Sequence, residues 1–201
     1  MKNILLNTVK ILPVLALLSC SSTHTQVKST NEVSSPPQIK RVFVVGIAKD
    51  DAIRKEFEND FASELGKYKV TAIPSYTVFP GDKIPDKDAL KAELAKDNID
   101  SVLITRLVSN KDVQQYVPGS VSPSYGNYWG FYGYGWGAAY TPGYTVTNQE
   151  VVLETNLYNT ASENLIWSAT SNTTSQAGNS AILNSFITAM VDKMQKDKLI
   201  K

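Results

Sequence analysis

Side chains that perform nucleophilic and acid–base chemistry are scarce in this chain. The only cysteine, Cys20, and the only histidine, His24, both lie near the N-terminus. The remaining residues therefore offer no cysteine nucleophile, histidine base or usual zinc ligand set. Two carboxylates suffice for glycoside hydrolysis, and Asp50 could pair with Glu56 or Glu154. Because no spacing selects such a pair, we predict no enzyme activity, catalytic residue, cofactor or metal site.

Cys20 is suited to a different reaction, the attachment of lipid. Lys2 and Lys10 are the only charges before it, and residues 11–18 are almost wholly apolar. This pattern is typical of a secretory signal, and its apolar run is too short to cross a bilayer. The residues Leu-Leu-Ser-Cys at 17–20 resemble the bacterial lipobox. In proteins with that motif the Cys sulfur receives diacylglycerol, the signal is cleaved before it, and the new amine is acylated.

The lipobox resemblance implies a location. Residues 1–19 would be removed as the signal peptide, and the acyl chains on Cys20 would hold the protein on a membrane. The residue after the cysteine is Ser21 instead of the Asp that favours inner-membrane retention. We therefore expect a cell-envelope protein on the outer membrane, facing the periplasm. The alternative is an ordinary secretory signal with a chance cysteine.

Charge argues against nucleic acid as a partner. The chain has 20 basic and 19 acidic residues, and cleavage would remove Lys2 and Lys10, so the mature chain would carry a net charge of −1. It has no basic footprint for nucleic acid and no dense basic cluster for anionic lipid. Residues 21–38 are rich in Ser, Thr and Pro. Such a composition favours disorder, so we expect residues 20–38 to be the lipidated cysteine and a flexible tether.

Residues 39–201 alternate strand and helix patterns and are long enough for one domain. We predict a single α/β (α+β) domain with a mixed sheet, in the order β-α-β-α-β-(long Gly/Tyr loop)-β-β-α. Either Asp50 or Asp51 is expected to cap the first helix, and Asp86 is expected to begin the second. The predicted strands are residues 41–48, 70–79, 101–108, 147–158 and 164–173, and the last helix is residues 180–197. The first three strands should pair in parallel and the last two as a hairpin.

Several stretches of this domain resemble a known group of proteins. They are VFVVGIAKDDAIRKEFENDFASEL, DSVLITRLV, YVPG, YTPGYTV and VVLETNLYNTASENLIWSA. They look like a family of uncharacterised bacterial lipoproteins, catalogued as a domain of unknown function. That resemblance implies a location and a fold but no activity. The order of elements also resembles, more weakly, the N-terminal domain of TolB and the peptidoglycan-synthase activator lipoproteins, which is likeness of fold only.

An aromatic insertion at about residues 113–146 interrupts the domain. Residues 113–149 contain no charged side chain, seven of the ten tyrosines and seven of the eleven glycines. A segment this long is expected to be functional or disordered, and its rings could stack on sugars, pack on a partner or lie at a membrane interface. It could equally cover its own domain. The candidate binding residues are Tyr125, Tyr128, Trp129, Phe131, Tyr132, Tyr134, Trp136, Tyr140 and Tyr144.

A second candidate site follows from topology. Ligands of open parallel sheets bind beyond the carboxyl ends of the strands, where Asp50, Tyr76 and Arg106 are predicted to lie. Asp50 is also explained as a helix cap. Arg106 alternates with apolar residues, which predicts burial, and a buried arginine needs a partner. We predict that Arg106 pairs with Glu154 across neighbouring strands.

These features favour a non-catalytic envelope module. It would be anchored to the membrane by lipid and would bind an envelope protein, glycan or lipid through the aromatic segment. One alternative is a carboxylate-dependent cell-wall glycan hydrolase. Another is an envelope scaffold that self-associates through the same segment, which would expose a large apolar patch.

Overall fold

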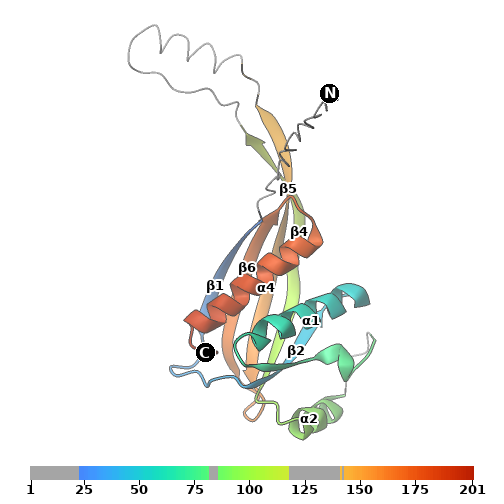
Figure 1. Ribbon diagram of the computed structural model, residues 1–201, viewed down its shortest axis with the longest axis vertical. Helices are drawn as coiled ribbons and strands as arrows, with labels where there is room; N and C mark the ends of the chain where they lie inside the picture. Colours follow the sequence, from blue (N-terminus) through green and yellow to red (C-terminus); the bar gives the residue numbers. More distant parts are fainter. Residues whose placement is uncertain (1–22, 82–85, 118–140, 142) are drawn as a thin grey trace, which may run out of the picture.

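A mixed sheet of six strands runs through the computed structural model, which describes residues 23–81, 86–117, 141 and 143–201 (Figure 1). Its strand order is β1-β6-β5-β4-β2-β3. The strands are β1 (His24–Asn31), β2 (Arg41–Ile47), β3 (Thr71–Pro74), β4 (Ser101–Val117), β5 (Tyr144–Asn159) and β6 (Leu165–Ser175). The predicted single α/β domain with a mixed sheet is confirmed.

Strand directions divide this sheet into two halves. β2 pairs in parallel with β3 and β4, as expected for strands joined by helices. β4, β5, β6 and β1 pair antiparallel, and β5 and β6 form the predicted hairpin. The second predicted strand is too long, because β3 ends at Pro74 and a short 3-10 helix, η1 (Ser75–Thr77), follows.

The described residues also form three α-helices: α1 (Asp51–Gly66), α2 (Lys87–Lys96) and α4 (Asn179–Lys196). Of the two candidate caps of α1, Asp50 is the one used, and Asp86 begins α2 as predicted. Asp50 accepts hydrogen bonds from the backbone of Ala52 and Ile53, and Asp86 does the same for the first turn of α2. None of the helices among the described residues is long and apolar enough to cross a membrane.

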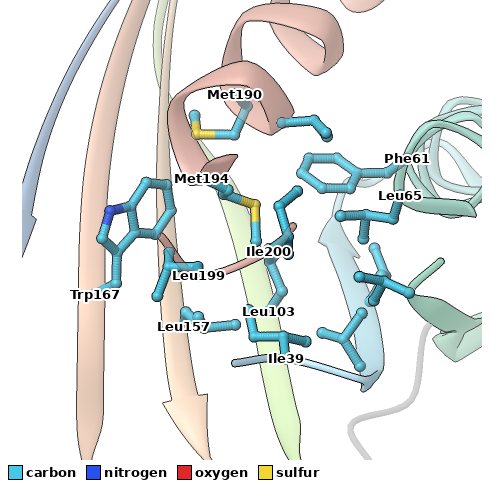
Figure 2. Packing of buried hydrophobic residues seen from close by; sticks show 14 of the residues in the cluster. Ile39, Phe61, Leu65, Leu103, Leu157, Trp167, Met190, Met194, Leu199 and Ile200 are labelled. Atoms are coloured by element: carbon cyan, nitrogen blue, oxygen red, sulfur yellow. The ribbon is translucent and has the colours of Figure 1, made fainter. Parts of the chain in front are cut away.

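The main core lies between the sheet and the helices α1 and α4, which cover the same face (Figure 1). Figure 2 shows the fully buried Trp167 of β6 facing the methionines of α4, with the side chains of α1 across the core. The C-terminal residues Leu199 and Ile200 are also buried there. Each such side chain stabilises the fold by roughly 1.5–3 kcal/mol.

A smaller cluster lies on the opposite face. Phe43, Val102 and Ile99 are buried there, packed with side chains of α2 and with Phe79. The cluster contains no residue of β1, β5 or β6, and exposed polar residues such as Lys28 mark that part of the sheet. Antiparallel strands tolerate water on one face, so this half of the sheet needs no cover.

The predicted flexible tether is wrong between residues 24 and 31. This segment forms β1, an edge strand that pairs with β6 over its whole length. Val27 of this strand packs against the core. Thr25, which faces the same way, forms hydrogen bonds with Thr173 of β6 and Ser185 of α4. Because hydroxyl contacts stabilise this strand, its composition resembles that of a disordered segment. The domain begins with β1, before residue 39.

Asp197 joins β1 to the rest of the domain. Its Oδ2 accepts hydrogen bonds from Ser29 Oγ at 2.5 Å and from Trp167 Nε1 at 2.8 Å. Lys193 of α4 donates to Oδ1. Burial alone would raise the pKa of Asp197, but the hydrogen bonds from Lys193, Ser29 and Trp167 outweigh it and hold the pKa below its ordinary value.

Replacing Asp197 should lower the free energy of unfolding and make that free energy less sensitive to acidic pH. The lowered pKa means that Asp197 stabilises the fold above the ordinary carboxyl value near pH 4, and this contribution disappears as the pH falls through the folded-state pKa. Asp197→Asn should cost about 2 kcal/mol at pH 7 and weaken the loss of stability below about pH 4. Urea unfolding across this range tests both effects. Asp192→Asn, on the same helix, is the control and should change little.

Removal of β1 should destabilise the whole domain. We compare a chain that begins at residue 23 with one that begins at residue 32. The shorter chain loses the packing of Val27 and the bond from Ser29 to Asp197, so its free energy of unfolding should fall by at least about 2 kcal/mol. Equal thermal midpoints for the two chains would contradict the structural role of β1.

Candidate functional site

A groove of about 980 Å³ lies at the carboxyl end of β2 and beside the middle of β4, between the N-terminal parts of α1 and α4. This is the end of a sheet at which topology predicts binding. Most of its wall is apolar and comes from five elements and the loop after β2. The apolar lining residues are Ile47, Ala48, Ile53, Phe57, Leu107, Val151, Leu153, Ile182 and Leu183.

Three of these apolar side chains are open to solvent. Ile47 is 60% exposed, Ile53 44% and Leu107 51%. They come from the end of β2, the first turn of α1 and the middle of β4. Single exposed apolar residues are ordinary, but several that line one groove mark a surface suited to a partner or ligand.

Charged and polar side chains surround this wall. Lys49, Asp50, Glu56 and Arg106 line the groove together with Asn110 and Asn179. Both of these carboxylates, Asp50 and Glu56, already have structural partners. Asp50 Oδ1 accepts from the backbone nitrogens of Ala52 at 2.8 Å and Ile53 at 3.2 Å. Glu56 accepts from Ser180 Oγ at 3.3 Å, which connects α1 to α4 across the groove.

The groove contains only two of the three predicted strand-end residues. Asp50 and Arg106 both line it. Tyr76 lies elsewhere, because η1 carries it along the side of α1. There its hydroxyl donates to Asn59 Oδ1 at 2.8 Å, and its ring is 5.8 Å from Lys55 Nζ. The three side chains therefore do not form one site.

The predicted pair of Arg106 and Glu154 is present. The two residues are direct partners of β4 and β5, and their side chains form an ion pair. The predicted burial is wrong, since 53% of the Arg106 side chain is exposed. Arg106 lies on the same face as the small cluster under α2 but beyond its edge. The alternation of apolar residues in β4 therefore continues past the part of the sheet that α2 covers, and Arg106 is exposed there.

A buried carboxylate beside the groove was not predicted. Glu58 is fully buried, and its Oε1 accepts from Gly46 N at 2.9 Å, Arg54 Nε at 3.1 Å and Ser75 Oγ at 2.6 Å. Its Oε2 accepts from Tyr76 N at 2.9 Å. The sequence signal is the spacing of four between Arg54 and Glu58 on the inner side of a helix.

Arg54 completes this network. Besides Glu58, its guanidinium donates to Ser75 Oγ at 2.8 Å, to Phe79 O at 3.2 Å and to Gly81 O. Carboxylate and guanidinium are therefore satisfied by neighbours from β2, η1 and the loop that follows. The pair fixes the position of α1 over the sheet and takes part in the groove only through Arg54, which lines it.

The strands β4 and β5 extend beyond the sheet as a two-stranded ribbon (Figure 1). Their pairing continues to Val117 and Tyr144, although β6 stops pairing with β5 at Gln149. The predicted insertion at 113–146 is therefore too long at both ends. Tyr144 is 62% exposed at the end of this ribbon. Cys20 lies outside the described residues. The other predicted aromatic residues also lie outside them, namely Tyr125, Tyr128, Trp129, Phe131, Tyr132, Tyr134, Trp136 and Tyr140.

In the part of the chain that the structure describes, no three residues among His, Cys, Asp and Glu are placed to share a metal ion. The described carboxylates of the groove are arranged as caps and bridges between helices.

No protein-family model matches the chain, and a search of curated proteins finds no match. The likeness to uncharacterised lipoproteins therefore stays a prediction. Two structures of the PelC dodecamer from Paraburkholderia phytofirmans are 13% identical to this chain, with TM-scores of 0.49 and 0.46. Each match covers 86% of this chain and 98–99% of the PelC chain.

A lipoprotein, GNA1162 from Neisseria meningitidis, is also 13% identical, with a TM-score of 0.44, and the match covers 78% of this chain and 99% of that one. These scores describe a general similarity of arrangement. They carry no argument about activity, partners or assembly.

Removing the charge of Glu58 should weaken the fold strongly. Glu58→Gln leaves the nearly buried Arg54 guanidinium, 12% exposed, without its carboxylate, and breaking a buried ion pair costs about 3–5 kcal/mol. The matched control is Asp51→Asn, which removes an exposed pair with Lys55 at the same spacing on the same helix and should cost under about 1 kcal/mol. Denaturant unfolding compares the two, and similar losses would contradict the assigned role of Glu58.

Proposed function

We propose that this protein is a lipid-anchored envelope protein that binds a partner and does not catalyse a reaction. The observation that carries the proposal is the apolar groove between α1 and α4, with Ile53 and Leu107 exposed on its wall. The anchor is the lipid expected on Cys20, supported by the signal pattern that precedes it. The outer membrane, facing the periplasm, is the proposed location.

The polar groups around the groove favour binding over catalysis. Asp50 caps α1, Glu56 bridges to Ser180, and Arg54 is held by Glu58. Each of these groups has a structural partner in the fold. An acid–base pair would instead need two groups directed toward a shared reacting atom.

The chemistry of the wall favours a protein partner. Aliphatic side chains from β2, β4, β5, α1 and α4 form it, and the only ring among its described lining residues, Phe57, is 5% exposed. Sugar recognition commonly uses exposed aromatic faces, which the described part of this wall lacks. An apolar segment of an envelope protein fits the wall, while Lys49 at the rim can meet its polar groups. Glycan recognition would fall to the aromatic residues between β4 and β5.

Two adjacent residues of β4 provide a matched test of the groove. Leu107 and Val108 are 51% and 49% exposed, but only Leu107 lines the groove. Leu107→Asp places a carboxylate on the apolar wall, so it should abolish binding of an apolar dye such as anilinonaphthalene sulfonate and lose the cross-linked envelope partner. Val108→Asp should keep both, with the circular dichroism of all three proteins unchanged.

Two outcomes would contradict this proposal. Equal dye binding and equal cross-linking by the two aspartate variants would show that the groove is not the binding surface. Turnover of purified cell-wall glycan by the protein, lost on changing Asp50, Glu56 or Glu154 to alanine, would show that the alternative glycan hydrolase is correct.

A further inference from the structure

The register of β1 fixes which end of the sheet lies nearest the expected lipid anchor. His24, at the start of β1, pairs with Thr174 of β6. Thr174 pairs with Glu150 of β5, which in turn pairs with Lys111 of β4. These four residues lie at one level across the sheet, at the end from which the ribbon projects (Figure 1).

The chain between Cys20 and this level is short. Only four residue steps separate Cys20 from His24, and a fully extended chain spans at most about 3.6 Å per residue. The sulfur-bearing residue can therefore lie no more than about 14 Å from the end of the sheet. A lipid on Cys20 would keep this end of the domain close to the bilayer.

The ribbon reaches farther than this connection. From the level of Lys111 it continues for six residues to Val117, which is about 20 Å at 3.4 Å per residue in an antiparallel strand. If the ribbon and the connection extend in the same direction, the end of the ribbon must meet the membrane that holds Cys20.

The described end of the ribbon has the chemistry of a membrane interface. Tyr116 is 64% exposed and Tyr144 62%. Tyr116 pairs with Thr145 and Tyr144 with Val117, so the two rings point to opposite faces of the ribbon. No charged residue occurs in 113–117 or 143–149. Tyrosine is enriched at the headgroup level of bilayers, and the absence of charge lowers the cost of entering it.

We propose that the end of the β4–β5 ribbon, with Tyr116 and Tyr144, contacts the lipid surface of the membrane to which Cys20 is anchored. This inference rests on the proposed lipid anchor. It gives the protein two attachments at one end of its sheet, the acyl chains and the ribbon. The opposite end, where β5 and β6 turn near Ala161, is directed away from the membrane.

Lipid-borne quenchers test the contact in the full-length lipidated protein. The lipidated Cys20 sulfur cannot react with a thiol probe, so a new cysteine carries the only label. Thr145→Cys places a bimane fluorophore beside Tyr116, and Ala161→Cys places it on the exposed turn at the far end. Both proteins are reconstituted in vesicles of phosphatidylethanolamine and phosphatidylglycerol, with and without brominated acyl chains. Mass spectrometry of the mature protein establishes whether Cys20 carries lipid.

Brominated lipid should quench the label at position 145 and leave the label at position 161 unchanged. Adding Tyr116→Asp and Tyr144→Asp to the Thr145→Cys protein should abolish the quenching, because charged side chains disfavour the interface. A lipidated protein whose label at position 145 is not quenched would overturn the inference and leave the groove unaffected. A mature protein without lipid on Cys20 would remove the anchor and this inference together, while the dye and cross-linking comparison of Leu107→Asp with Val108→Asp would still judge the groove.

Discussion

The buried carboxylate of Glu58 is the interaction on which the arrangement around the groove depends. It accepts hydrogen bonds from the end of β2, from η1 and from Arg54 of its own helix, so three separate segments converge on one side chain. A buried ion pair adds little to stability compared with apolar packing, but its loss leaves uncompensated charge. The same contact brings α1 close to β2, where a Cβ atom on Gly46 would lie 2.5 Å from the Phe57 ring. The height of α1 over the sheet, and with it the width of the groove, follows from these two constraints.

Most elements of the fold could be predicted because their apolar periodicity is strong. Buried runs such as Val42, Phe43 and Val44 and the amphipathic residues of α4 leave few alternatives. β1 was missed because its inward residues Thr25 and Ser29 are fixed by hydroxyl hydrogen bonds to partners more than 140 residues away. Such contacts leave no local pattern. Composition alone therefore predicted a disordered tether where the structure has an ordered edge strand.

The candidate site could be predicted only in part, for a related reason. Topology places the ends of parallel strands at one edge, and Asp50 and Arg106 both line the groove, although the Arg106 side chain pairs with Glu154 on the other face of the sheet. It could not show that β3 ends at Pro74 and that η1 then directs Tyr76 along α1. Nor does a strand pattern reveal how far a covering helix extends. Leu107 follows the apolar pattern of a core residue, but it is exposed because it lies in the groove between α1 and α4.

The position of β1 also determines how the domain would respond to a mechanical load. A pull on Cys20 along the axis of β1 acts on all eight residue pairs between β1 and β6 at the same time. Hydrogen bonds loaded in this shearing direction must break together, whereas a pull across the strand would open them one after another. The contact of Ser29 with Asp197 adds a side-chain bond near the far end of the strand. With the proposed lipid on Cys20 and the proposed partner in the groove, β1 would therefore transmit tension between the two through its whole set of pairs with β6.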